Sequence, residues 1–142
     1  MRTWGEGILA VVVISTIGLG LFLSTGQSMT GNGGANSPPT AADPEAATRG
    51  AALAEGMGCL VCHSVDGTPG SGPTWKGLAG SSRPLVSGET AIADDAYLHA
   101  AIVDPSSEIV RGYDDLMPDN YGTQLSPEEI DDLVEYIKSL SG

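Results

Sequence analysis

Positive charges and aromatic side chains are scarce in this sequence of 142 residues. Six Lys and Arg stand against 18 Asp and Glu, which gives a net charge of −12 at pH 7. Such a surface argues against binding to nucleic acid and against electrostatic adhesion to anionic lipid. The aromatic side chains number one Phe, two Trp and four Tyr. The chain therefore has few large rings with which to fill a core.

Cysteine and histidine are rarer still, with two of each. Both cysteines and one histidine fall in the pentapeptide Cys59-Leu60-Val61-Cys62-His63. Two cysteines three residues apart, with a histidine directly after the second, are typical of covalent c-type haem attachment. The two sulfurs bind the haem vinyl groups, and His63 reaches the iron.

The sequence supports three other uses of the cysteines less well. A zinc site needs four ligands, and His99 is the only further histidine or cysteine in the chain. A thioredoxin-like dithiol needs a βαβ surround that the flanking sequence lacks, and a structural disulfide leaves the histidine unexplained. With both cysteines used for attachment, no disulfide framework, lipid-anchor cysteine or dinuclear copper site is available. Because no internal repeat is evident, we predict one haem c. A soluble part of about 95 residues buries only a modest core, and the haem would supply much of it.

The N-terminal part contains an uncharged apolar run at residues 8–23. With its flanks it spans about 24–30 Å as a helix, just enough to cross a bilayer. We expect residues 1–26 to be a single transmembrane anchor, with Arg2 and the amino terminus on the inner side. The alternative is a cleaved signal peptide, for which Ser24 and Gly26 offer small residues near a cut. Residues 27–43 are rich in Gly, Ser, Asn and Pro and predict a flexible tether.

The third segment, residues 44–142, is predicted to be an all-α domain. Cap and periodicity signals predict a helix from Pro44 to about Met57, a helix from Asp94 or Asp95 to Val103, and a last helix capped by Ser126. A small hairpin is expected within residues 83–92, and residues 112–118 are expected to be loop.

Met117 is the leading candidate for the second axial ligand of the iron. It lies in a loop, precedes Pro118, and is far enough from His63 in the chain to reach the other side of a haem. Thioether ligation raises the reduction potential relative to two histidines. His99 is the runner-up, and a core-packing role for Met117 is the plain alternative.

Together, these features resemble a monohaem class I cytochrome c over residues 43–140. They comprise the CxxCH motif, Gly72-Pro73, Met117-Pro118 and an amphipathic last helix with Tyr136. The resemblance implies that the Pro73 carbonyl accepts a hydrogen bond from Nδ1–H of His63 and so holds the ring in place. It also implies that Gly50 and Tyr136 meet where the first and last helices cross. Further cofactor-binding candidates are Trp75, Leu98, Ile102, Tyr113 and Arg111. For a haem propionate, Arg111 ranks before Arg83 and Trp75.

Several longer motifs narrow the resemblance. Gly-Pro-Thr-Trp-Lys-Gly-Leu and Gly-Tyr-Asp-Asp-Leu-Met-Pro are similar to the cytochrome domain fused to some oxidase subunit II chains. They also resemble the membrane-associated monohaem subunit of alternative complex III, which the missing copper ligands favour. This likeness implies a non-enzymatic relay of single electrons from a quinol-oxidising complex to a terminal acceptor.

The same likeness implies a location and partners. We expect a single-pass plasma-membrane protein with its haem domain on the periplasmic face. Its partners would be other subunits of the complex and a multihaem cytochrome, blue copper protein or oxidase. The alternatives are a free or tethered shuttle that donates to an oxidase, and a haem sensor or peroxidase.

One departure from the family concerns charge. Where relatives often carry Pro-Pro before the ligand methionine, this chain has Asp114-Asp115, and Asp119 follows. No carboxylate spacing here matches a calcium loop. The three acids are either part of a solvated loop or an edge that steers a basic partner.

Overall fold

The computed structural model describes residues 41–141. The predicted anchor at residues 1–26, and the predicted tether up to residue 40, lie outside the described part of the chain. Among residues 41–141, no helix has both the length and the apolar content needed to cross a membrane.

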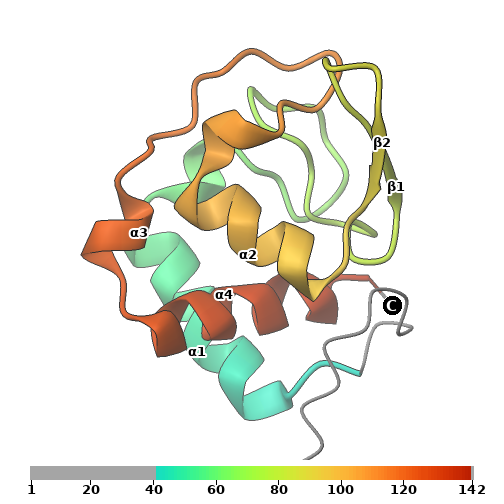
Figure 1. Ribbon diagram of the computed structural model, residues 1–142. Helices are drawn as coiled ribbons and strands as arrows, with labels where there is room; N and C mark the ends of the chain where they lie inside the picture. Colours follow the sequence, from blue (N-terminus) through green and yellow to red (C-terminus); the bar gives the residue numbers. More distant parts are fainter. Residues whose placement is uncertain (1–40, 142) are drawn as a thin grey trace, which may run out of the picture. The chain divides into compact units, whose positions relative to one another are not determined.

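The described chain is predominantly helical, as predicted, with one small sheet (Figure 1). The helices are α1 (Pro44–Gly56), α2 (Asp95–Val103), α3 (Tyr121–Gln124) and α4 (Pro127–Ser139), with 3₁₀ turns η1 (Cys59–Val61) and η2 (Pro105–Ser107). Strands β1 (Ser82–Pro84) and β2 (Thr90–Ile92) pair antiparallel, which confirms the predicted hairpin. Of the four α-helices, only α3 was not predicted, because its four residues are too few for a periodic pattern and no side chain caps it.

The two long helices begin at the caps that the sequence predicts. The Asp43 carboxylate accepts hydrogen bonds from the backbone N–H groups of Glu45 (2.9 Å) and Ala46 (3.2 Å). At α4, Ser126 and Glu129 form a capping box in which each side chain bonds the backbone of the other, at 3.3 and 2.8 Å. These bonds satisfy N–H groups that have no partner inside a helix. Local chemistry therefore sets where both helices start.

Helices α1 and α4 cross closely at the bottom of the molecule in Figure 1. A Cβ built on Gly50 would overlap the backbone carbonyl of Asp132 and lie 2.8 Å from Cβ of Tyr136. The predicted meeting of Gly50 and Tyr136 is therefore present. Arg49 adds a two-point ion pair to the buried Asp132, with N–O distances of 2.7 and 2.6 Å. Only glycine at position 50 permits this crossing.

A buried lysine joins α4 to the start of α2. The Lys138 side chain is 4% exposed, and its Nζ donates to Glu135 at 2.7 Å and to Asp95 at 3.0 Å. Burial by itself would lower the pKa of Lys138, but these two carboxylates outweigh it and raise the pKa.

The apolar core lies between α2, α4 and the loop around Trp75. Its buried members are Ala54, Trp75, Leu78, Ala93, Leu98, Ile102, Leu125, Ile130, Leu133, Val134 and Ile137.

The helix crossing generates a stability prediction. Gly50→Ala should lower the free energy of unfolding by about 1–3 kcal/mol, the usual cost of overpacking, because the added methyl group meets backbone that cannot rotate away. Gly56→Ala is the matched control, since no atom lies within 4 Å of a Cβ there. It should be neutral or stabilising by up to about 1 kcal/mol. Urea unfolding measures both, and equal stability of the two variants would contradict the close crossing.

Candidate cofactor site

One apolar cavity lies between α2, the η1 turn, and the loops around residues 71–75 and 113–118. It encloses about 1090 Å³ of space, part of it open to solvent. Nine of the ten predicted cofactor-binding residues line it: Cys59, Cys62, His63, Pro73, Trp75, Leu98, Ile102, Tyr113 and Met117. The fold therefore gathers segments more than 50 residues apart around a single cavity.

The η1 turn places both thiols at the cavity wall. The backbone N–H groups of Cys62 and His63 both bond the carbonyl of Cys59, at 3.2 and 3.0 Å. Cys59 and Cys62 are not joined by a disulfide, and burial raises the pKa of the Cys59 thiol. Within residues 41–141, no group of three His, Cys, Asp or Glu side chains is close enough to hold a metal ion. The zinc alternative therefore finds no ligand set in this part of the chain.

His63 is held in one orientation. Its Nδ1 lies 2.7 Å from the carbonyl oxygen of Pro73, a contact that requires the proton on Nδ1. The Nε2 atom is then free of a proton and available as a metal ligand. The ring stacks on Trp75, with centroids 5.1 Å apart and planes inclined by 23°.

The surroundings of His63 also keep its ring neutral and in place. Burial lowers the pKa of His63, and the Pro73 carbonyl opposes that change only in part. A Cβ at Gly72 would lie 2.6 Å from the Cε1 atom of the ring. The Gly72-Pro73 pair therefore supplies both the room and the hydrogen bond that orient the histidine.

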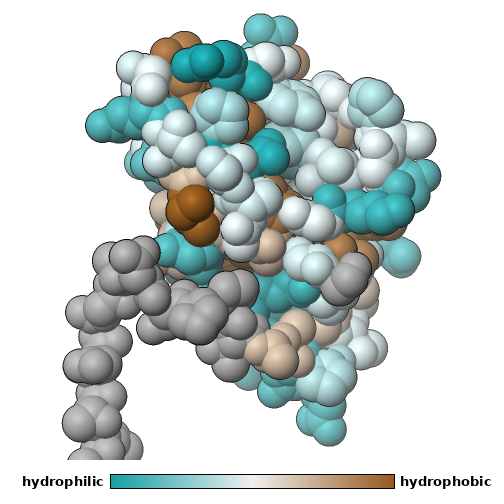
Figure 2. Space-filling view, turned by 90° about the vertical axis from the view of Figure 1, so that its right-hand side faces the viewer, coloured by the Kyte–Doolittle hydropathy of each residue, from teal (hydrophilic) through white to brown (hydrophobic). Residues whose placement is uncertain are grey.

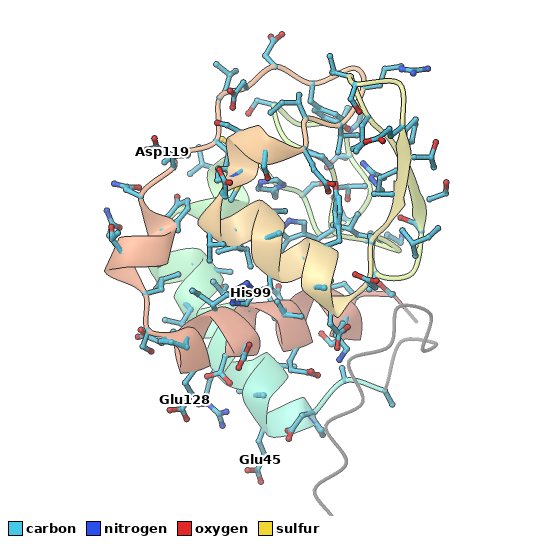
Figure 3. All side chains as sticks on the ribbon, in the orientation of Figure 1. Glu45, His99, Asp119 and Glu128 are labelled. Carbon is cyan, nitrogen blue, oxygen red and sulfur yellow. The ribbon has the colours of Figure 1, made fainter. Side chains whose placement is uncertain are left out.

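The remaining walls come from α2 and the loop that follows it. Leu98 and Ile102, which are 2% and 7% exposed, face the cavity from α2. Met117 is half-buried in the wall formed by the loop at residues 113–118. His99, labelled in Figure 3, lies on α2 and does not line the cavity. Of the two candidates for second axial ligand, the structure brings only Met117 to the same cavity as His63.

The structure reverses the ranking of Arg111 and Arg83 as candidates for binding a haem propionate. Arg111 is exposed, lies outside the cavity wall, and donates to the carbonyl of Leu85 at 3.4 Å. Arg83, ranked lower from the sequence, lines the cavity. Its position at the centre of β1 turns it toward the protein, and its buried Nε has no hydrogen-bond partner within the described residues. A buried N–H group of this kind needs an acceptor. Arg83 therefore has a free donor with which to bind an acidic group of a ligand.

Two tyrosines in the cavity wall were missed from the sequence. Tyr97 lines the cavity next to Leu98, and burial raises the pKa of its hydroxyl. Its spacing of four residues from Ala101, another wall residue, was a usable signal for a shared helix face. Tyr121 belongs to the unforeseen α3, and its hydroxyl donates to the carbonyl of Met57 at 3.4 Å. No local pattern pointed to it.

The family model described as Cytochrome c matches residues 47–141, which include most of α1, the cavity walls and α4. A search of curated protein sequences finds no match.

The tight space at Gly72 predicts the effect of a single methyl group. Gly72→Ala should push the His63 ring from the Pro73 carbonyl and lower the free energy of unfolding by about 1–3 kcal/mol. Soret circular dichroism of the haem-loaded protein should change as well, because it reports the surroundings of the cofactor. Gly56→Ala is again the control and should leave the dichroism unchanged. A Gly72→Ala protein with native dichroism and stability would show that the ring is not confined there.

Proposed function

Because the chain belongs to the cytochrome c family, an electron-transfer family with covalently attached haem c, we propose that it relays single electrons from a quinol-oxidising membrane complex to a terminal acceptor. Its one domain implies one haem. The haem, when bound, supplies an iron that changes valence by one electron, and the protein supplies attachment, potential and docking.

The residues around the cavity fit this cofactor. Cys59 and Cys62 lie on one turn and would hold the haem through two thioether bonds. His63 would bind the iron through its unprotonated Nε2, because its Nδ1 carries the proton that is donated to the Pro73 carbonyl. Arg83, with its unsatisfied Nε, would bind a propionate. These assignments follow from the wall geometry and from the chemistry of each donor.

The observation that carries the electron-carrier proposal is that His63 and Met117 line the same cavity. With both as ligands, the iron has no position left for a substrate. Sulfur is a weak acceptor of hydrogen bonds and suits the apolar wall. A sensor or peroxidase needs a vacant or labile sixth position, so this arrangement favours a carrier over either of them.

The place of the protein in a membrane complex is proposed on sequence grounds. The apolar run at residues 8–23 supports an anchor, and the motifs around Trp75 and Met117 resemble the monohaem subunit of alternative complex III. We propose a single-pass plasma-membrane protein whose haem domain is periplasmic and whose partners are subunits of that complex. The redox partner would be a multihaem cytochrome, a blue copper protein or an oxidase. A free or tethered shuttle to an oxidase is the second candidate.

The ligand assignment is tested by Met117→Leu, which keeps the wall apolar and removes the sulfur. The oxidised variant should lose its sulfur-to-iron charge-transfer band. Its reduction potential should fall by about 0.1 V or more, since axial ligands shift haem potentials over roughly 0.8 V. The reduced variant should also bind carbon monoxide readily, because the sixth position is open.

Met57→Leu is the matched control, since Met57 does not line the cavity, and it should leave the band, the potential and carbon monoxide binding unchanged. An unaltered spectrum in Met117→Leu would place the ligand elsewhere. Rapid carbon monoxide binding by the unmodified reduced protein would defeat the carrier proposal in favour of a sensor or peroxidase.

The membrane assignment is tested by gentle detergent extraction of native membranes, followed by isolation of this chain. We expect quinol-oxidising, iron–sulfur or multihaem subunits to be recovered with it, and the intact mass to include residues 1–26. Recovery alone with an intact N-terminus would identify a tethered shuttle. Loss of about 26 residues, a typical signal-peptide length, would identify a freely diffusing one.

A further inference from the structure

Two exposed apolar side chains lie at or next to the cavity wall. Among the described residues, the two most exposed large apolar side chains are Val61 (86%) and Leu116 (67%). Val61 directly precedes the wall residue Cys62, and Leu116 is itself a wall residue next to Met117. Figure 2 shows the hairpin side of the molecule, where hydrophobic side chains appear singly among hydrophilic ones. Scattered exposure of that kind is ordinary. Val61 and Leu116 differ because each lies at or next to the wall of the same cavity.

Uncompensated negative charge lies in the same part of the wall and next to it. Asp114 and Asp115 are wall residues, and Asp119 follows two positions after Met117. Ser106 donates to Asp115 at 3.0 Å and holds its carboxylate in place. Elsewhere in residues 41–141, Asp132, Asp95 and Glu135 are paired with Arg49 or Lys138. None of these three acids takes part in an ion pair with another of residues 41–141.

We propose that Val61, Leu116, Asp114, Asp115 and Asp119, called here the mouth surface, dock a redox partner protein whose contact surface is apolar at its centre and basic around it. This inference rests on the proposed function and adds the chemistry of the partner. One electron passes from the reduced haem iron to the oxidised centre of the partner, and no bond forms or breaks. The acids speed the encounter with a positive surface, and the apolar side chains exclude water from the contact.

Other occupants fit the mouth surface less well. A second copy of this chain would bring two acidic openings together, which costs energy because like charges repel. An anionic lipid surface would be repelled for the same reason. Charge therefore favours a basic redox protein.

Two small oxidants separate the contributions of charge and apolar contact. Tris(phenanthroline)cobalt(III) is an apolar cation of charge 3+, and hexacyanoferrate(III) is a polar anion of charge 3−. Each accepts one electron from the reduced protein, and stopped-flow absorbance follows the rate. The cobalt rate should fall as salt rises, and the hexacyanoferrate rate should rise, because salt screens attraction and repulsion alike.

The charge contribution is tested with two matched double variants. Asp114→Asn/Asp119→Asn removes two charges at the opening, and Glu45→Gln/Glu128→Gln removes two at the opposite end of the domain, as Figure 3 shows for Asp119, Glu45 and Glu128. At low salt the first variant should lower the cobalt rate about threefold or more and raise the hexacyanoferrate rate. The second should change both by less than about 1.5-fold. Equal effects of the two variants would mean that only net charge matters, and would overturn the mouth surface.

The apolar contribution is tested with Leu116→Ser against Ile92→Ser, a control 53% exposed on β2. Leu116→Ser should lower the cobalt rate and spare the hexacyanoferrate rate, whereas Ile92→Ser should change neither. If Leu116→Ser behaves like Ile92→Ser, the proposed partner is wrong although electron transfer stands. The same holds if sedimentation shows dimers of the unmodified protein that Leu116→Ser abolishes. A reduced protein that neither oxidant oxidises would instead overturn the proposed function itself.

Discussion

The hydrogen bond between His63 Nδ1 and the Pro73 carbonyl, at 2.7 Å, is the contact on which the site depends. A neutral hydrogen bond contributes only about 1 kcal/mol to stability, but this one decides which ring nitrogen faces the cavity. It requires that the loop after the CxxCH turn fold back on the turn, and Gly72 allows that return without a clash. Trp75 then packs against the ring from the same loop. The segment of residues 63–75 thus fixes one imidazole.

The crossing of α1 and α4 supports this loop from below. Because only Met57 and Gly58 separate the end of α1 from Cys59, any shift of α1 along α4 would move both thiols. Gly50 sets the depth of the crossing, and the Arg49–Asp132 pair lies beside it. The nearly buried Asp132 carboxylate would be left uncompensated if α1 slid away, and an unpaired buried charge is costly. On the other side of α4, Lys138 links the helix to Asp95 at the start of α2. The same helix therefore positions the attachment turn and the wall that carries Leu98 and Ile102.

Charge is distributed unevenly over the domain. The basic side chains Arg49 and Lys138 are paired with carboxylates at the helix contacts, and Arg83 faces the cavity. The acids at the cavity opening are left without such partners within residues 41–141. An apolar cavity with an acidic opening keeps water from the cofactor while presenting a charged surface at its edge. These two properties suit a protein that must exchange electrons through brief contacts.

The sequence by itself determined the features whose partners are close in the chain. The CxxCH motif, the caps at Asp43 and Ser126, and the hairpin all depend on contacts within about ten residues, and local spacing is sufficient to predict them. The predicted anchor and tether still rest on the sequence alone.

Only the tertiary structure decided which distant side chains reach the cavity. It placed Arg83 in the wall rather than Arg111, because the path of β1 and the bridge between Leu85 and Val110 set the direction of each side chain. It likewise brought Tyr121 to the wall and left His99 outside it. These outcomes depend on how loops of the chain pass one another, and no local pattern of residues encodes that path.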